Sequence, residues 1–117
     1  MTEIVSQELA RMAAELTLTR KALDVTIMDL RKLDGVTDFF VVCHGDSDVQ
    51  VKAIADAVED GLRGEGVRPW HKEGYTYLSW VLLDYVDVVV HVFYRDTRKF
   101  YSLERLWGDA VMTEVKE

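Results

Sequence analysis

Cysteine and long apolar runs are scarce in this sequence, and each scarcity excludes a class of protein. The single cysteine, Cys43, cannot form a disulfide within the chain and is typical of a reducing compartment. No apolar run approaches the roughly 20 residues that cross a bilayer. The N-terminus is acidic and lacks the apolar region of a secretory signal. We therefore expect a cytoplasmic protein that builds its core without cross-links.

Positive charge is also limited. The chain has 21 acidic and 14 basic residues, which gives a formal charge of −7. Its densest basic segment, from Arg95 to Lys99, holds three cations and is interrupted by Asp96. Binding that depends on phosphates needs a basic face, so we expect little direct contact with nucleic acid. An acidic protein can still approach an RNA-rich particle by docking on a basic protein component of it.

Motifs for catalysis, cofactor binding and metal binding are missing. Cys43 lies in an apolar run and is expected to be a buried, unreactive residue. The three histidines, His44, His71 and His91, lack the spacing of a metal site. Ser47 has no nucleophile elbow around it and instead begins a capping box. We therefore expect neither a cofactor nor a metal ion.

Hydrophobic periodicity predicts a single α+β domain over residues 1–117, with a helix at 2–18 and a sheet domain at 22–110. Further helices are expected from 51 to Gly64 or Gly66 and at 97–110. The predicted strands are 23–30, 39–44, 69–73, 78–85 and 88–94. A turn is expected at 33–35. The result is a mixed, roughly five-stranded sheet flanked by helices.

Two neighbouring strands predict a semi-polar aromatic surface. Trp80, Leu82 and Asp84 alternate onto one face of the first strand, and His91 and Phe93 share a face of the next. These two sets lie side by side if the hairpin register permits it. A carboxylate beside Trp80 indicates that this face meets solvent or a partner, and tryptophan is enriched among interface hot spots. We expect Trp80 to be an interface residue; for Trp107, core and interface remain open.

Several sequence blocks, in their order and spacing, resemble the ribosomal silencing factor family, the bacterial RsfS or Iojap-related proteins. The resemblance covers about residues 23–110 and rests on the segments 37–42, Gly45-x-Ser47, 54–56, Glu73-Gly74, 80–84, 88–93 and Arg98-x-x-Tyr101-x-Leu103-Glu104-x-Leu106-Trp107. It implies a nucleotidyltransferase-like fold without the catalytic residues. It also implies binding to the large ribosomal subunit through ribosomal protein L-fourteen, which blocks joining of the small subunit and represses translation during starvation. Family members often form homodimers.

We predict a docking face for this partner on the Trp80 side of the sheet. The expected partner-binding residues are Trp80, Leu82, Asp84, His91, Arg98, Tyr101 and Glu104. Trp80 would be the buried anchor, while Asp84 and Glu104 would pair with basic residues of the ribosomal protein. Arg98 is alternatively an internal clamp on an acidic neighbour.

Two other functions are open at this point. One is a nucleotidyltransferase-like enzyme that would use Asp84 or Asp87, although these two residues are three apart and do not share a strand face. The other makes the aromatic surface only a homodimer interface. Two positions depart from the family: Val49 replaces a commonly basic residue, and Val86 replaces a turn glycine. Because valine resists positive φ, we expect a different turn here or an unusual conformation at Asp87.

Overall fold

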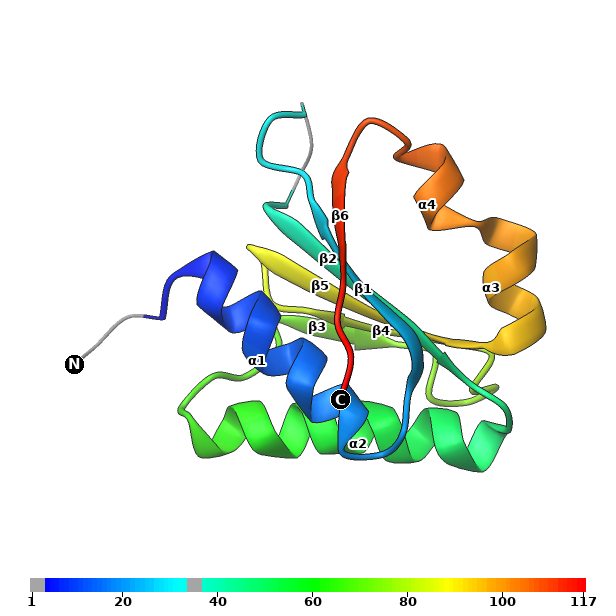
Figure 1. Ribbon diagram of the computed structural model, residues 1–117. Coiled ribbons are helices and arrows are strands. Elements are labelled where there is room, and N and C mark those ends of the chain that lie inside the picture. The colour runs from blue at the N-terminus through cyan, green and yellow to red at the C-terminus, as the bar shows by residue number, and fades with distance from the viewer. Residues whose placement is uncertain (1–3, 34–36) are drawn as a thin grey trace.

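A computed structural model describes residues 4–33 and 37–117, and within them a mixed sheet carries helices on both faces (Figure 1). The elements in chain order are α1 (Ser6–Leu18), β1 (Leu23–Asp29), β2 (Phe39–Gly45), α2 (Asp48–Gly64), β3 (His71–Glu73), β4 (Trp80–Asp84), β5 (Val88–Tyr94), α3 (Arg95–Tyr101), α4 (Leu103–Leu106) and β6 (Val111–Glu114). The strand order is β3-β4-β5-β2-β1-β6. Only β2 and β5 pair in parallel among these neighbours. The mixed α+β fold predicted from the sequence is confirmed.

Helices α1 and α2 cover one face of the sheet and enclose the larger core (Figure 1). The inward residues Val88, Val90 and Val92 of β5 have no solvent exposure, as their alternation predicted. The two helices pack closely because Gly61 has no side chain. A Cβ at Gly61 would lie 2.4 Å from a methyl carbon of Leu16. The close contact between Gly61 and Leu16 therefore fixes how α1 and α2 pack against each other over this face.

The opposite face is covered less completely. Its buried cluster contains Met28, Leu30, Phe40, Val42, Val89, Phe93 and Leu103. Trp80, Leu82 and Trp107 pack against this cluster but stay partly exposed. Helices α3 and α4 are short and lie on this side of the sheet (Figure 1), and Trp80, Leu82 and Asp84 of β4 stay partly exposed. The half-covered face is where the candidate site lies.

The prediction of one closing helix at 97–110 is wrong. Helix α3 begins at Arg95 and ends at Tyr101, and Ser102 then adopts a left-handed conformation, with φ of 43°, before the short α4. The chain continues into β6, which pairs antiparallel with β1 and makes the sheet six-stranded rather than five-stranded. A four-residue strand has too short a hydrophobic alternation to be recognised, and it forms because β1 offers unpaired backbone groups at its edge.

Other predicted boundaries are largely confirmed. The Ser47 side chain accepts a hydrogen bond from the Gln50 backbone N–H at 3.1 Å, which is the predicted helix cap. Helix α2 ends at Gly64, and Gly66 follows with φ of 81°. The strand predicted at 78–85 is shorter because Leu78 has φ of 59°, outside extended backbone. The predicted helix start at residue 2 and part of the predicted turn, residues 34 and 35, lie outside the described residues. Within the described chain, no helix combines the length and apolarity that a membrane span needs.

Candidate functional site

The β4–β5 hairpin places the predicted residues side by side. In its register Trp80 pairs with Phe93, Leu82 with His91, and Asp84 with Val89. Residues that pair directly in an antiparallel ladder project to the same side of the sheet. The alignment that the sequence left dependent on register is therefore the one observed. We call this surface the aromatic face, and its members are Phe40, Trp80, Leu82, His91, Phe93, Tyr101 and Trp107.

Trp80 is the centre of the aromatic face. Its ring centroid lies 4.8 Å from that of Phe93 beneath it and 4.8 Å from that of Tyr101 on α3. Its indole N–H donates a hydrogen bond to Nδ1 of His91 at 3.1 Å. Trp80 is only partly buried, and Tyr101 remains 46% exposed. The indole is thus held in one orientation by its neighbours while part of its surface stays accessible.

His91 lies beneath the surface, and the prediction that it extends the docking surface is not supported by its position. It is 4% exposed and packs edge-on to Phe40, with ring centroids 4.5 Å apart. Burial lowers the pKa of His91 to about 3, so the ring is neutral at neutral pH. Because Nδ1 accepts from Trp80, the ring proton sits on Nε2, which is buried and has no partner in the described part of the chain. His91 therefore orients Trp80 from below.

Arg98 is an internal clamp, which was the alternative to a contact with the partner. The residue is 8% exposed, and its Nε and Nη2 donate to one carboxylate oxygen of Glu104 at 3.3 and 3.0 Å. Its Nη1 donates to the Leu23 carbonyl at 3.3 Å and lies 2.9 Å from Nδ1 of His44. These contacts join α3 and α4 to β1 and β2. The Glu104 carboxylate is engaged within the chain, so its proposed pairing with a partner's basic residue is disfavoured.

Asp84 closes the turn between β4 and β5. One of its carboxylate oxygens accepts the Val86 backbone N–H at 2.8 Å. Val86 itself has φ of 74°, and the Asp87 N–H donates to the Tyr85 carbonyl across it at 2.9 Å. The expectation that valine would avoid this conformation, or pass it to Asp87, is wrong: the hairpin imposes it on Val86. Asp84 remains partly exposed and can still meet a partner.

The structure adds residues that the sequence patterns did not identify. Phe40 links the face to Trp107 through an edge-on contact at 5.8 Å, and Trp107 is partly exposed, between core and surface. Phe100 and Leu106 are 81% and 72% exposed. Apolar spacing did not predict that Phe100 and Leu106 are exposed, because it indicated one continuous helix where Ser102 separates two short ones.

Two groups that the sequence offered for chemistry can be placed in the structure. Cys43 is fully buried, and burial raises the pKa of its thiol to about 12, which keeps it protonated as expected. Over residues 4–33 and 37–117, no three histidine, cysteine or carboxylate side chains gather as metal ligands would. What the face offers is rigid aromatic surface with an acidic residue at its end.

Comparison with known proteins identifies the family. A family described as "Ribosomal silencing factor during starvation" matches residues 3–117. The chain belongs to the ribosomal silencing factor family. It is 40% identical to the ribosomal silencing factor RsfS of Halalkalibacterium halodurans over 95% of both chains. It is 39% identical to that of Bacillus subtilis over 93% of this chain and 92% of that one. The family resemblance predicted from the sequence is confirmed.

A solved structure agrees in fold. A crystal structure of a Chromobacterium violaceum protein matches with a TM-score of 0.87 and 38% identity, covering 90% of this chain and 88% of that one. The family's name describes a regulatory factor rather than an enzyme.

One of the sequence blocks on which the resemblance rested, Glu73-Gly74, has a direct structural reason. Gly74 has φ of 93°, and a Cβ at this position would lie 1.9 Å from the Trp80 carbonyl oxygen. The Gly74 carbonyl also accepts the Leu78 N–H at 3.0 Å. The Glu73-Gly74 block therefore shapes the loop that delivers Trp80 to β4, because only glycine tolerates both the conformation and the close approach.

Proposed function

We propose that this protein represses translation in the cytoplasm by binding the large ribosomal subunit through ribosomal protein L-fourteen, which blocks joining of the small subunit. Membership of the ribosomal silencing factor family supports a ribosome-associated role. The observation that carries the proposed contact is the partly exposed Trp80, fixed by Phe93, Tyr101 and His91.

Physical chemistry supports this face as the contact. A tryptophan already held in place loses little conformational freedom on binding, so more of its contact energy appears as affinity. Tyr101, which contacts the anchor, and Trp107, which contacts Phe40, add to the apolar area of this face. Asp84 and the net charge of −7 would speed association with a basic ribosomal protein. The acidic contribution is expected from Asp84 rather than from Glu104, whose carboxylate is held by Arg98.

Co-sedimentation with separately purified large and small subunits tests the proposal. The protein should pellet with the large subunit only. Trp80→Ala should lose at least ~2 kcal/mol of binding, about thirtyfold, if Trp80 is a hot spot. The matched control is Tyr77→Ala, which removes an 86% exposed ring from the loop between β3 and β4, outside the aromatic face, and should bind normally.

A second variant distinguishes loss of the contact from loss of the fold. Tyr101→Ala removes a 46% exposed ring that contacts Trp80, so it should weaken binding without emptying the core. Circular dichroism of both variants reports on the fold. Pelleting with neither subunit, or full binding by both folded variants, would contradict the proposed contact.

The family resemblance also leads us to propose a homodimer, and light scattering distinguishes its interface from the ribosomal one. If Trp80→Ala converts dimers into monomers that still bind the large subunit, the aromatic face joins two copies of this chain and the ribosomal contact lies elsewhere. If the variant loses ribosome binding and keeps its oligomeric state, the aromatic face is the ribosomal contact.

A further inference from the structure

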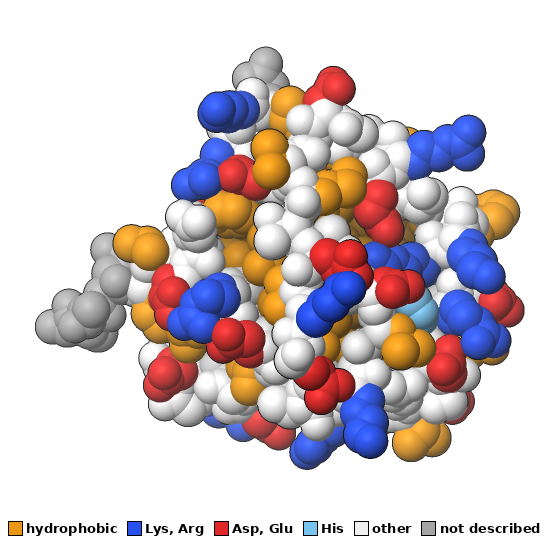
Figure 2. Space-filling view, in the orientation of Figure 1, with side chains coloured by type: hydrophobic (Ala, Val, Ile, Leu, Met, Phe, Trp, Pro, Cys, Tyr) orange, Lys and Arg blue, Asp and Glu red, His pale blue; other side chains and the backbone are white. Residues whose placement is uncertain are grey.

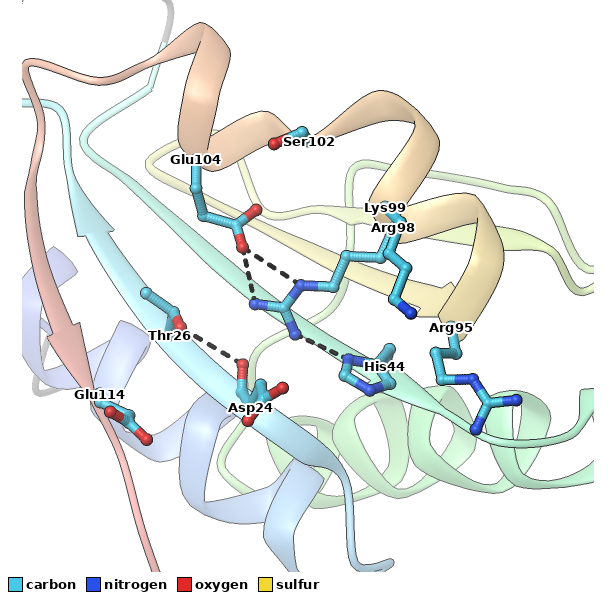
Figure 3. A pocket seen from close by; sticks show the side chains of 9 residues that line it. All are labelled: Asp24, Thr26, His44, Arg95, Arg98, Lys99, Ser102, Glu104 and Glu114. Carbon is cyan, nitrogen blue, oxygen red and sulfur yellow. Dashed lines mark hydrogen bonds and ion pairs between the residues drawn. The ribbon is translucent and has the colours of Figure 1, made fainter.

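A hollow of about 650 Å³ lies between β1, β6 and α3, apart from Trp80 and its neighbours (Figure 3). Its lining includes Asp24, His44, Arg95, Arg98, Lys99 and Glu114. Small-molecule sites typically measure about 300–1,000 Å³, so a metabolite of modest size fits. This hollow has no part in the proposed docking on the ribosome.

The His44 ring, which lines the hollow, presents a hydrogen-bond donor that is fixed in place. Arg98 always carries its protons, so its contact with Nδ1 of His44 requires that nitrogen to accept. The proton of His44 therefore sits on Nε2, which remains free to donate. Burial and the neighbouring Arg98 charge lower the pKa of His44, which keeps the ring in this neutral form. Because Arg98 is anchored on Glu104 and Leu23, the imidazole is held in place.

The charges around the hollow are separated by element. Arg95 and Lys99 come from α3, whereas Asp24 and Glu114 come from β1 and β6 on the other side (Figure 3). Arg95 pairs with Asp46 at 3.0 Å. Glu114 pairs with Lys116 at 3.7 Å where both side chains are exposed, whereas Lys99 forms no ion pair among the described residues. Counting the Arg98–Glu104 pair, the lining carries three cations and three carboxylates, which cancel. Figure 2 shows basic and acidic side chains interspersed on this side, with no large patch of one sign.

Backbone distortion is concentrated at the same place. Asp24 and Ser102 both line the hollow and both have positive φ, 48° and 43°. The pairing of β1 with β2 is irregular between Leu23 and Thr26, which turns Asp24 out of the ladder. Such bulges and left-handed residues cost free energy and recur at ligand sites, where they aim particular groups.

We propose that the hollow binds a small zwitterion of the amino-acid class. The ligand's carboxylate accepts from the Lys99 ammonium and the His44 Nε2–H, and its ammonium group donates to Asp24 and Glu114. A lining with no net charge offers little to a multiply charged phosphate, whereas opposed cations and carboxylates match a dipolar molecule. Among the described residues, no phenylalanine, tyrosine or tryptophan lines the hollow, so none of them is placed to stack on a nucleobase.

Nuclear magnetic resonance titration of the ¹⁵N-labelled protein with each of the twenty amino acids tests this proposal without ribosomes. At least one should bind with a Kd on the order of 1 mM or tighter and shift the signals of Asp24, His44 and Lys99. The N-acetyl and carboxamide derivatives of that amino acid each lack one charge. Both should bind at least ~10-fold more weakly, since each loses a charged contact.

Variants assign the two ends of the ligand. Lys99→Met and Asp24→Asn should each weaken binding at least ~10-fold, and asparagine tolerates the positive φ of this position. The matched control is Lys52→Met, an exposed lysine of α2 away from the hollow, which should leave binding unchanged. If Asp24→Asn disturbs the fold, as judged by its spectrum, Glu114→Gln replaces it.

Three results would overturn the proposal. The first is the absence of any shift with all twenty amino acids up to ~10 mM, an affinity too weak to matter. The second is equal binding by the N-acetyl or carboxamide derivative. The third is stronger binding of inorganic phosphate or adenosine monophosphate to the same residues, which would make this an anion site.

Discussion

Replacing Val86 by glycine should stabilise this protein. Val86 has φ of 74° in the turn between β4 and β5, a conformation that β-branched residues strongly disfavour. Its side chain is 55% exposed, so it contributes little burial in return. The turn is held by the Asp84 carboxylate on the Val86 N–H and by the Asp87 N–H on the Tyr85 carbonyl. Both contacts use backbone or neighbouring groups that the substitution leaves intact.

The expected gain follows from two opposing terms. A non-glycine residue in the left-handed region costs roughly 1–2 kcal/mol. Glycine loses an additional ~0.5–1 kcal/mol of backbone entropy on folding. The net stabilisation is therefore about 0.5–1 kcal/mol, which corresponds to a rise in Tm of roughly 2–5 °C for a chain of this size.

Urea unfolding followed by circular dichroism measures this gain as a higher midpoint with an unchanged slope. The matched control is Val49→Gly, because Val49 is 75% exposed and lies in the first turn of α2. That change should destabilise by about 0.5 kcal/mol, since glycine is the poorer helix former. A midpoint for Val86→Gly at or below that of the unsubstituted protein would refute the strain argument.

Three further predictions concern the supports of the aromatic face. Gly74→Ala should destabilise by more than ~2 kcal/mol, because its Cβ would collide with the Trp80 carbonyl oxygen at a positive φ. His91 stays neutral in the folded state, whereas in the unfolded state it protonates below its ordinary pKa. Its contribution to the free energy of unfolding is therefore complete above about pH 6.5 and is lost as the pH falls toward the folded pKa of about 3. Urea unfolding should show that His91→Leu removes about 2 kcal/mol of the stability loss between pH 7 and pH 5. Arg98→Met should lower the free energy of unfolding by about 3 kcal/mol in the same assay, because it leaves Glu104, the Leu23 carbonyl and His44 without their charged donor.

Each of these has a control or a contrary result. Arg11→Met removes an arginine from exposed pairs on α1 and should cost less than ~1 kcal/mol, so an equal cost for Arg98→Met would mean that the clamp is screened by solvent. A tolerated Gly74→Ala would show that the loop before Trp80 can shift. Identical pH dependence with and without His91 would show that its ring titrates normally in the folded protein.

Local patterns were sufficient for much of the fold. Alternation in 88–94 identified the buried valines, and Ser47 with Gln50 located the start of α2. The short connection at Val86 and Asp87 also predicted the β4–β5 hairpin, whereas its register stayed open, because a one-residue slip reverses every side chain. Such features depend on residues close in sequence, whose spacing carries the information.

The chain after Tyr94 was predicted poorly because its structure depends on distant residues. Helix α3 ends where Ser102 turns so that Glu104 can reach Arg98, and that pair is anchored on Leu23 and His44. The formation of β6 likewise requires β1 as a template. The contacts of Arg98 with His44 and Leu23 span 54 and 75 residues, so local spacing carries no signature of them.

The sequence by itself determined the family, the α+β class, the acidic character and the face on which Trp80 lies, since composition, spacing and period-two alternation are properties of the chain alone. Only the tertiary structure decided that His91 lies beneath Trp80, that Arg98 is a clamp, and that Asp24 and Lys99 face one hollow. The reason is physical: burial, pKa and pairing arise from groups brought together across the sheet, and these separations in sequence reach 75 residues for Arg98 and Leu23.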